Sequence, residues 1–401
     1  VSGLLRQLSP VWQIFAAIVP RGGPAHQRKR TTIMATMEIA VVGAGIAGLA
    51  VAGGLLKRGH GVTIFEADSE IRAGGSGITL GPNALTALDY LGCGEDFRAL
   101  QQAQPKLYGG QRSQNGRWLS KIAPEITTQS LALDRAELHS ILKRHAEGAG
   151  LRVGVEVVGV DKQKGALTTK DGKSHTFDLI VGADGIRSAV RAAWPEDPGI
   201  EDAGYGTWRG ISPKPSEGAV MASESLGVKK RFGIVPLHDD RVYWFAVQSQ
   251  SPDEQPLSQF ESWHSPIAEL IATAEEEPQF LPIRELAGDL NTYTRGKVVL
   301  IGDAAHAMTP NLGQGACQAL EDAAVLVAQL AKHADLNKAL GAFDASRLPR
   351  TQTFANQSRT IGKALQAGGP LVTRFCNTML WCVPNALLAM PVAKLASWRV
   401  E

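Results

Sequence analysis

Apolar and polar residues first fall into an ordered pattern after residue 37. The mostly apolar stretch Glu38–Val42 predicts a strand, and the small residues from Gly43 to about Arg58 predict a glycine turn followed by a helix. A second apolar stretch, Val62–Phe65, predicts another strand, which ends at Glu66. Strand, glycine turn, helix, strand and acid in this order predict a βαβ unit at the start of an α/β fold.

The pattern changes character along the rest of the chain. Residues 204–250 alternate between apolar and polar, with a turn at His238–Asp240, and predict antiparallel hairpins. Other segments predict a helix over Leu133–His145, strands over Leu151–Val160, Asp178–Val181 and Lys297–Ile301, and a long helical region over Ala316–Gln366. The pattern therefore predicts a nucleotide-binding domain that is interrupted by a separate sheet.

An apolar tail, Phe375–Leu395, follows these elements. It contains Pro384 and Pro391, so we expect broken helices near the pocket rather than an uninterrupted membrane span of about 18 or more apolar residues. A peripheral membrane contact stays open as an alternative.

Composition restricts the class of protein. The 401 residues provide two or three domains at about 150 residues each, and 44% hydrophobic with 20% charged residues is typical of a globular protein. A net charge of +2 provides no broad basic surface, so we expect no nucleic-acid partner. The four cysteines have no metal-ligand spacing and are too few for a disulfide framework, which favours a reducing, cytoplasmic location without a metal site.

Residues 1–37 differ from the rest of the chain in charge, because they contain arginines and a lysine but no acidic residue. Three interpretations stay open. The segment is an organellar transit peptide, a signal peptide built on the short apolar stretch Val11–Val19, or an overextended start with initiation at Met34 or Met37.

The glycine turn carries a dinucleotide-binding fingerprint. Gly43 permits the tight turn, Gly45 lets backbone approach a pyrophosphate, and Gly48 lets the helix pack on the strand. The positive end of the helix dipole would face the phosphates, and Glu66 would accept hydrogen bonds from ribose hydroxyls. The predicted cofactor site also includes Ala47 and Ala67.

Three motifs in fixed order resemble one family. They are the fingerprint Gly43–Gly48 with Glu66, the segment Asp178–Ser188 (DLIVGADGIRS) and the segment Gly302–Pro310 (GDAAHAMTP). Over about residues 38–365 the chain is similar to the single-component FAD-dependent aromatic hydroxylases, the group A flavoprotein monooxygenases. The wording of Gly77–Asn83 and Met308–Gly315 resembles the branch of salicylate, 3-hydroxybenzoate and urate hydroxylases and zeaxanthin epoxidase.

The resemblance implies an α/β fold with a Rossmann-like FAD-binding domain of the p-hydroxybenzoate hydroxylase type, an inserted antiparallel-sheet substrate domain and C-terminal helices. The expected boundaries are 1–37 for the basic leader, 38–110 with 131–200 and 285–345 for the FAD-binding domain, 111–130 with 201–284 for the substrate-binding sheet, and 346–401 for the C-terminal helices. Only one GxGxxG motif occurs, so NAD(P)H would bind transiently rather than in a second nucleotide fold.

The resemblance also implies residue roles around FAD. Asp303 would bind ribityl hydroxyls, Arg135 would pair with the pyrophosphate, and Arg72 would hold the adenosine end. The helix that begins at Gly313, Gly315 and Ala316 would stabilise negative charge on the reduced flavin, and Pro310 would lie beside the ring edge where oxygen reacts. Gly77 and Asp184 complete the expected cofactor site.

The implied reaction is an NAD(P)H- and O2-dependent hydroxylation of an electron-rich aromatic or conjugated small molecule. Oxygen and reduced flavin would form a C4a-hydroperoxide, and the protein would supply a dry pocket and orientation. Two alternatives stay open: an epoxidase of an isoprenoid or quinone, and a flavin-binding sensor without turnover. The expected assembly is a monomer or a homodimer.

Substrate activation would lie on the hairpin that turns at His238–Asp240. By resemblance, Arg231 would lower the pKa of a phenol or enol and hold its anion. Tyr243, on the adjacent strand near Arg231, would contact the substrate as the second catalytic residue. Arg231 would otherwise belong to a surface run with Lys229 and Lys230, and Tyr243 would otherwise be packing.

The residues after the third motif also bear on substrate binding. Asn311 would face the substrate, with Pro310 beside it, or would cap a helix. No histidine is expected to act as a base.

Overall fold

The computed structural model describes residues 36–71, 76–216, 220–249, 256–382 and 385–401. Almost the whole predicted leader and Arg72 lie outside these described residues, so both predictions stay open. The described residues belong to one compact unit.

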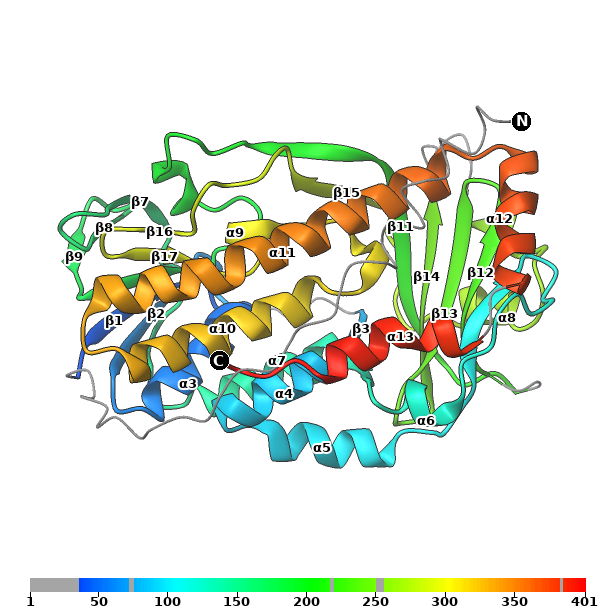
Figure 1. Cartoon of the computed structure of the whole chain (residues 1–401), viewed down its shortest axis with the longest axis horizontal. Coiled ribbons are helices and arrows are strands. Elements are labelled where there is room, and N and C mark those ends of the chain that lie inside the picture. Colours follow the sequence, from blue (N-terminus) through cyan, green and yellow to red (C-terminus); the bar gives the residue numbers. More distant parts are fainter. Residues whose placement is uncertain (1–35, 72–75, 217–219, 250–255, 383–384) are drawn as a thin grey trace, which may run out of the picture. The chain divides into compact units, whose positions relative to one another are not determined.

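The first sheet is mostly parallel, and its central strands are apolar and buried on both faces. Its order is β16 (Thr294–Arg295), β17 (Val298–Leu300), β10 (Leu179–Gly182), β1 (Glu38–Val42), β2 (Gly61–Phe65) and β6 (Gly150–Arg152). The pairs β1–β2, β1–β10, β10–β17 and β2–β6 are parallel. Continuous apolar strands of this kind are typical of a parallel sheet covered by helices. Figure 1 shows α3 (Ile46–Leu56), α10 (Gly315–Lys332) and α11 (Leu336–Ala367) over this sheet.

The second sheet follows the predicted alternation. Its order is β15 (Leu281–Leu286), β11 (Ile200–Pro213), β14 (Arg241–Gln248), β13 (Lys230–Pro236), β12 (Ala222–Gly227) and β4 (Gly109–Ser113). One face packs Phe232, Trp244 and Ala246 against Phe260 and Ile267, from η2 (Leu257–Phe260) and α8 (Ile267–Ala272). Successive strand residues point to opposite faces, so the other face is left to line a cavity.

The remaining elements connect or cover these sheets. They are β3 (Gly77–Leu80), paired with β5 (Leu131–Asp134); a small sheet of β7 (Val157–Asp161), β8 (Ala166–Thr169) and β9 (Ser174–Thr176); helices α4 (Pro82–Leu91), α5 (Gly94–Ala103), α6 (Pro124–Thr127), α7 (Arg135–His145), α9 (Asp303–His306), α12 (Pro370–Cys382) and α13 (Asn385–Ala396); and the 3-10 turns η1 (Arg191–Ala193) and η3 (Pro310–Leu312). The predicted α/β fold class is confirmed.

Several predicted boundaries were wrong for local reasons. The helix predicted from Leu133 begins only at Arg135, because Leu133 pairs in a strand with Ile78 and the Asp134 carboxylate caps the helix by accepting from Ala136 N at 2.9 Å. The long region Ala316–Gln366 is two helices, since Asp335 caps the second by accepting from Lys338 N at 2.9 Å. The strand predicted over Leu151–Val160 is likewise two strands in different sheets.

The second sheet also uses residues from across the predicted domain boundaries. Strand β4 begins at Gly109, just before the boundary at 110, and β15 continues to Leu286, past the boundary at 284. Helix α11 runs without a break across 345–346. A boundary carried over from a family resemblance does not fix which sheet a strand at the boundary joins.

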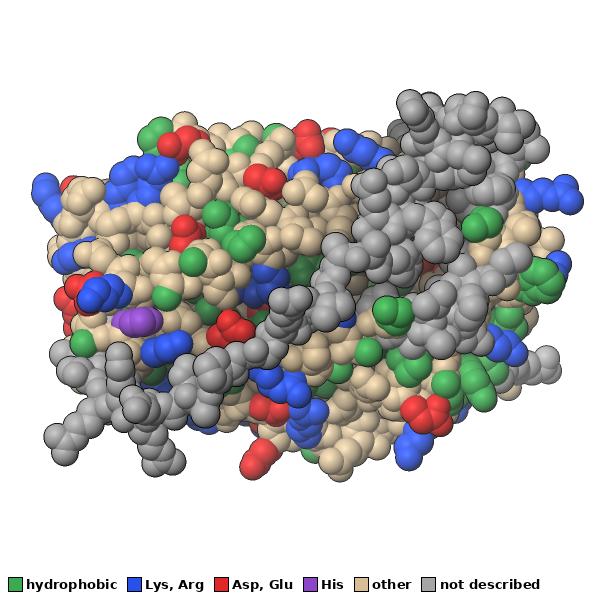
Figure 2. Space-filling view, in the orientation of Figure 1, with side chains coloured by type: hydrophobic (Ala, Val, Ile, Leu, Met, Phe, Trp, Pro, Cys, Tyr) green, Lys and Arg blue, Asp and Glu red, His purple; other side chains and the backbone are tan. Residues whose placement is uncertain are grey.

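The expected broken helices of the apolar tail are α12 and α13. No helix in the described part of the chain is long and apolar enough to span a membrane. On the face shown in Figure 2, acidic and basic side chains are mixed, and apolar side chains are exposed among them. A peripheral membrane contact stays a prediction.

Candidate active site

A cavity of about 480 Å³ lies between the glycine turn, the free face of the second sheet and the segment after β17. This volume is in the usual range for small-molecule sites. Many of the predicted site residues line it: Gly45, Ala47, Gly77, Arg135, Arg231, Tyr243, Asp303, Pro310, Asn311, Gly313, Gly315 and Ala316. Residues from distant parts of the sequence therefore meet at one place.

The three glycines of the fingerprint have different surroundings. Gly43 has φ +100°, and a Cβ there would lie 2.4 Å from the Ala183 carbonyl oxygen; a Cβ at Gly48 would lie 2.0 Å from the Gly43 carbonyl oxygen. Gly45 has no atom within 4 Å of its Cβ position and lines the cavity. Gly43 and Gly48 thus allow the close backbone packing, and Gly45 leaves room for a ligand.

Side chains hold this turn from both sides. Glu66 accepts a hydrogen bond from Ala44 N–H at 2.7 Å, and His139 Nε2 lies 2.8 Å from the Ala44 carbonyl oxygen. Burial lowers the pKa of His139, which favours a neutral ring that donates to this carbonyl. His139 is a supporting residue that the sequence did not reveal.

The segment after β17 presents open backbone and a free carboxylate. Asp303 is exposed to the cavity, and its side chain has no hydrogen-bond or ion-pair partner within the described residues. Gly313 (φ +61°) and Gly315 have no atom within 4 Å of their Cβ positions. Because Gln314 gives α10 no side-chain cap, the first N–H groups of this helix are available to an anion.

Arg135 provides a positive charge at the same cavity. It begins α7, it is exposed, and it has no ion-pair partner among the residues that the structure describes. A guanidinium in this situation suits a pyrophosphate. Together with the open positions at Gly45, Gly313 and Gly315, it makes the cavity fit FAD.

The other predicted cofactor residues lie behind the lining. Gly43, Gly48, Glu66, Ala67 and Asp184 are outside the set of residues that lines the cavity. Asp184 accepts from Ser188 Oγ at 2.6 Å and from Val190 N–H at 3.1 Å, and burial raises its pKa. Its carboxylate therefore organises its own loop, whose backbone neighbours Ala183 and Gly185 reach the cavity.

Arg231 is buried in the cavity wall, with 5% of its surface exposed, although Lys229 two residues earlier is exposed. Its Nη1 donates to Glu224 Oε1 at 2.9 Å and its Nη2 to Asn311 Oδ1 at 2.7 Å. Its Nε is buried without a hydrogen-bond partner among the described residues. Arg231 lies within β13, where alternation turns it away from the packed face that holds Phe232, whereas Lys229 lies in the turn before the strand.

Asn311 is the hub of this polar cluster. Its Nδ2 lies 2.8 Å from Tyr205 Oη, 3.0 Å from Thr309 Oγ1 and 2.9 Å from the Ser358 carbonyl oxygen, while its Oδ1 accepts from Arg231. Asn311 is thus held by three elements. Sequence reasoning missed Glu224, Tyr205 and Ser358 because nothing local in their segments points to Arg231 or Asn311.

Tyr243 lies on the strand next to Arg231 but not opposite it. In the register, Tyr243 pairs with Val235, and Arg231 pairs with Val247. The Tyr243 ring packs on Gly77, where a Cβ would lie 2.2 Å from the ring, and burial raises the pKa of Tyr243. Gly77 is therefore needed for ring packing as well as for the cavity wall.

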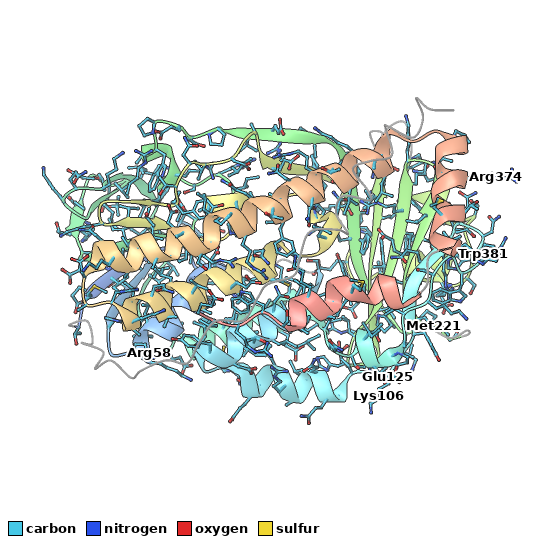
Figure 3. All side chains as sticks on the ribbon, viewed as in Figure 1. Arg58, Lys106, Glu125, Met221, Arg374 and Trp381 are labelled. Atoms are coloured by element: carbon cyan, nitrogen blue, oxygen red, sulfur yellow. The ribbon has the colours of Figure 1, made fainter. Side chains whose placement is uncertain are left out.

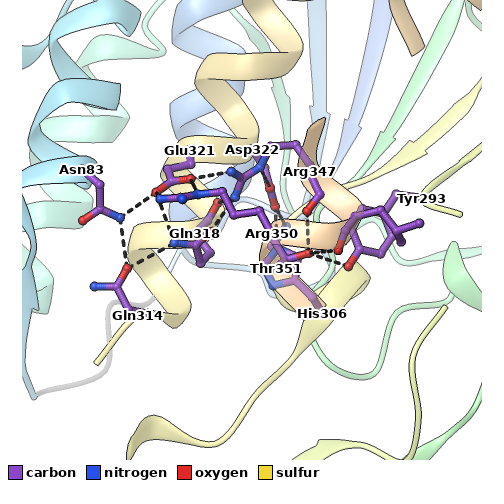
Figure 4. A network of polar contacts seen from close by, with 12 residues as sticks. Asn83, Tyr293, His306, Gln314, Gln318, Glu321, Asp322, Arg347, Arg350 and Thr351 are labelled. Carbon is purple, nitrogen blue, oxygen red and sulfur yellow. Dashed lines mark hydrogen bonds and ion pairs between the residues drawn. The ribbon is translucent and has the colours of Figure 1, made fainter. Parts of the chain in front are cut away.

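A buried ionic network lies behind the segment that carries Asp303 (Figure 4). Asp322 accepts from Gly302 N–H at 2.9 Å, from His306 Nε2 at 2.6 Å and from Arg347 Nε at 2.7 Å, and Arg347 also binds Glu321. Burial favours the neutral acid, but the charges of His306 and Arg347 hold the pKa of Asp322 below its ordinary value. His306 thus holds Asp322 within the buried network.

Comparison with known proteins agrees with this geometry. A family model described as an FAD binding domain matches residues 36–358. The chain is 37% identical over 372 residues to 2-heptyl-3-hydroxy-4(1H)-quinolone synthase of Pseudomonas aeruginosa, covering 87% of this chain and 95% of that protein. It is 34% identical over 348 residues to aurachin C monooxygenase/isomerase of Stigmatella aurantiaca, covering 82% and 89%.

A solved structure shows the same fold. Klebsiella pneumoniae HpxO, complexed with FAD and uric acid, superposes with a TM-score of 0.81 at 25% identity, covering 90% of this chain and 96% of that chain. The matched family model and these relatives establish the cofactor and the enzyme class. The chain belongs to the FAD-dependent aromatic hydroxylases, a family of flavoprotein monooxygenases.

Proposed function

We propose that this enzyme uses NAD(P)H and O2 to hydroxylate an electron-rich ring that carries an acidic oxygen, a phenol or an enol. The ring of a 4-hydroxyquinoline, drawn also as a 4(1H)-quinolone, belongs to this class. The name of the quinolone synthase of Pseudomonas aeruginosa and the uric acid in the HpxO structure support a nitrogen-containing ring of this kind.

The observation that carries the proposal is the buried, incompletely paired guanidinium of Arg231. One of its donors has no partner among the described residues, and a buried polar atom in this state calls for a partner. A substrate oxygen in the cavity would accept a hydrogen bond from the guanidinium of Arg231. Positive charge beside that oxygen lowers the pKa of a phenol or enol and increases the electron density of the ring.

The cavity supplies the remaining requirements. When bound, FAD would supply the redox chemistry: two electrons from NAD(P)H reduce O2, so that one oxygen atom enters the substrate and the other leaves as water. Tyr243 and Pro310 contribute lining on two sides, and Asn311 and Glu224 fix the guanidinium of Arg231. The role of the protein's own residues is therefore to orient the ring, exclude water and hold the anion.

The test compares Arg231→Met with Lys229→Met, a change at the exposed basic residue two positions away. FAD-loaded enzymes are mixed with 4-hydroxyquinolines, phenols and urate; NAD(P)H oxidation is followed, and 18O from labelled O2 is measured in the product. We expect wild type and Lys229→Met to hydroxylate at least one ring class. Arg231→Met should keep its FAD and lose product at least tenfold, because a charge-assisted hydrogen bond contributes about 1.5–3 kcal/mol.

Two results would count against the proposal. Equal product from Arg231→Met and wild type would remove Arg231 from substrate activation. Failure of every ring compound to stimulate NAD(P)H oxidation by the FAD-loaded wild type would reject the proposed reaction.

A further inference from the structure

A second cavity, which we call the side cavity, adjoins the main one. Its volume is about 320 Å³, and its lining shares Thr79, Glu224, Val235 and Phe245 with the main cavity. Glu224 and Phe245 lie in one cross-strand row with Gly233 between them. A Cβ at Gly233 would lie 2.1 Å from the Phe245 ring, so the missing side chain lets this ring lie flat at the junction of the two cavities.

The side cavity is apolar. Its lining includes Leu107, Ile122, Ile126, Ile234, Val235 and Phe245. Glu224 is the one charged residue in the described lining, and its carboxylate is already paired with Arg231 at the junction. Such a surface favours hydrocarbon over water.

Three polar side chains in the lining donate hydrogen bonds to nearby backbone. Gln104 Nε2 donates to the Ser130 carbonyl oxygen at 2.9 Å, Thr127 Oγ1 to that of Leu107 at 2.8 Å, and Thr128 Oγ1 to that of Pro124 at 2.7 Å. These groups need no ligand partner. What they leave exposed to the cavity is mainly apolar surface.

The side cavity extends away from the flavin loops toward the outside. Its lining runs from the junction to α6 and to α13, which contributes Val392. Both helices lie beside the second sheet in Figure 1. Lys106 and Glu125, the charged neighbours of Leu107 and Ile126, lie at the outer edge of the molecule (Figure 3). The apolar path therefore begins next to Arg231 and ends close to the surface.

We propose that the side cavity binds a hydrocarbon chain attached to the substrate ring, so that the substrate is an amphiphile with its ring at Arg231 and its alkyl or isoprenoid chain between α6 and β13. This inference rests on the proposed function for the ring. The shared lining of the two cavities and the absence of unpaired charge in the described lining of the second argue for a chain rather than a polar substituent.

The experiment uses FAD-loaded enzyme and 2-alkyl-4-hydroxyquinolines with chains of one to nine carbons. Affinity, measured by calorimetry, should rise about fourfold for each added methylene until the cavity is full, and should then stop rising. Ala222 is half-buried, lines the side cavity and lies beside Gly109 on the neighbouring strand β4. Ala222→Phe should therefore make affinity stop rising at a shorter chain length, while the methyl compound binds and reacts as in wild type. The control Ile200→Phe changes an exposed residue at the start of β11 and should behave as wild type.

A second arm separates this inference from the proposed reaction. Nonan-1-ol, which has a chain but no ring, should bind to wild type and to Ile200→Phe and lose affinity at least tenfold in Ala222→Phe, whether or not any ring is hydroxylated. Hydroxylation of the methyl compound with affinities that do not change with chain length would overturn the chain site and leave the proposed function standing. Affinity that rises with chain length, without hydroxylation of any compound, would overturn the proposed function and leave the chain site standing. If affinity depends on chain length in Ala222→Phe as it does in wild type, the chain site would also be overturned.

Discussion

At the scale of single residues, neighbours in sequence have different tasks. Arg231 is buried at the cavity while Lys229 faces solvent, and Gly45 leaves space where Gly43 and Gly48 permit close packing. Residue type alone indicated that these positions matter. The distinction between contact with a ligand and support of the backbone came from the distances around each residue.

Asp303 provides a prediction at this scale. Asp303→Ala should raise the dissociation constant for FAD roughly ten- to hundredfold, because hydrogen bonds from ribityl hydroxyls to a carboxylate contribute about 1.5–3 kcal/mol. Titration of the apoprotein with FAD measures this constant. Asp96→Ala, a change at an exposed acid on α5, should bind FAD as wild type does. An Asp303→Ala protein with unchanged affinity would place Asp303 outside the cofactor site.

At the scale of elements, α10 and α11 are joined by buried charges rather than by an apolar seam alone. Arg347 is fully buried between Glu321 and Asp322, and Arg350 also binds Glu321. Asp322 in turn holds the backbone of Gly302 next to Asp303. The position of the segment that carries Asp303 thus depends on α11, which begins more than thirty residues later.

Removal of one charge from this network should lower the stability of the fold. Arg347→Met leaves two buried carboxylates without their shared partner, and we expect the free energy of unfolding to fall by about 3–5 kcal/mol. Urea unfolding of the apoprotein measures it. Arg98→Met, which breaks the partly exposed pair with Asp89, should cost about 0–1 kcal/mol. Equal losses in both variants would contradict the importance of the network.

At the scale of the whole molecule, burial lowers the pKa values of four histidines, two of which lie on α7. They are His60, His139, His145 and His264. In the window below the unfolded pKa of about 6.5, the unfolded chain binds protons that the folded protein does not. Stability is therefore present above this pKa and is lost as the pH falls toward the folded values.

Urea unfolding of the apoprotein should thus give a lower free energy of unfolding at pH 5.5 than at pH 7.5. His145 has a buried Nε2 without a hydrogen-bond partner among the described residues, so its protonation leaves a buried charge. His145→Gln should weaken the pH dependence. His333→Gln, at the end of α10, should leave it as in wild type. A free energy of unfolding that does not change between these pH values would show that the four rings titrate alike in both states.

The sequence alone determined the first βαβ unit with its dinucleotide fingerprint, the alternating sheet and the broken tail, because each depends on local periodicity or on residues at short spacing. The expectation of FAD came instead from the resemblance of three separated motifs to one family. Only the tertiary structure decided that Leu133 and Asp134 belong to a strand, that β4 joins a distant sheet, and that Arg231 lies four register positions from Tyr243. It also brought Glu224, Asn311 and Tyr205 to one guanidinium and opened the side cavity beside it. These features depend on strand register and on contacts between segments far apart in the chain, and no local pattern encodes them.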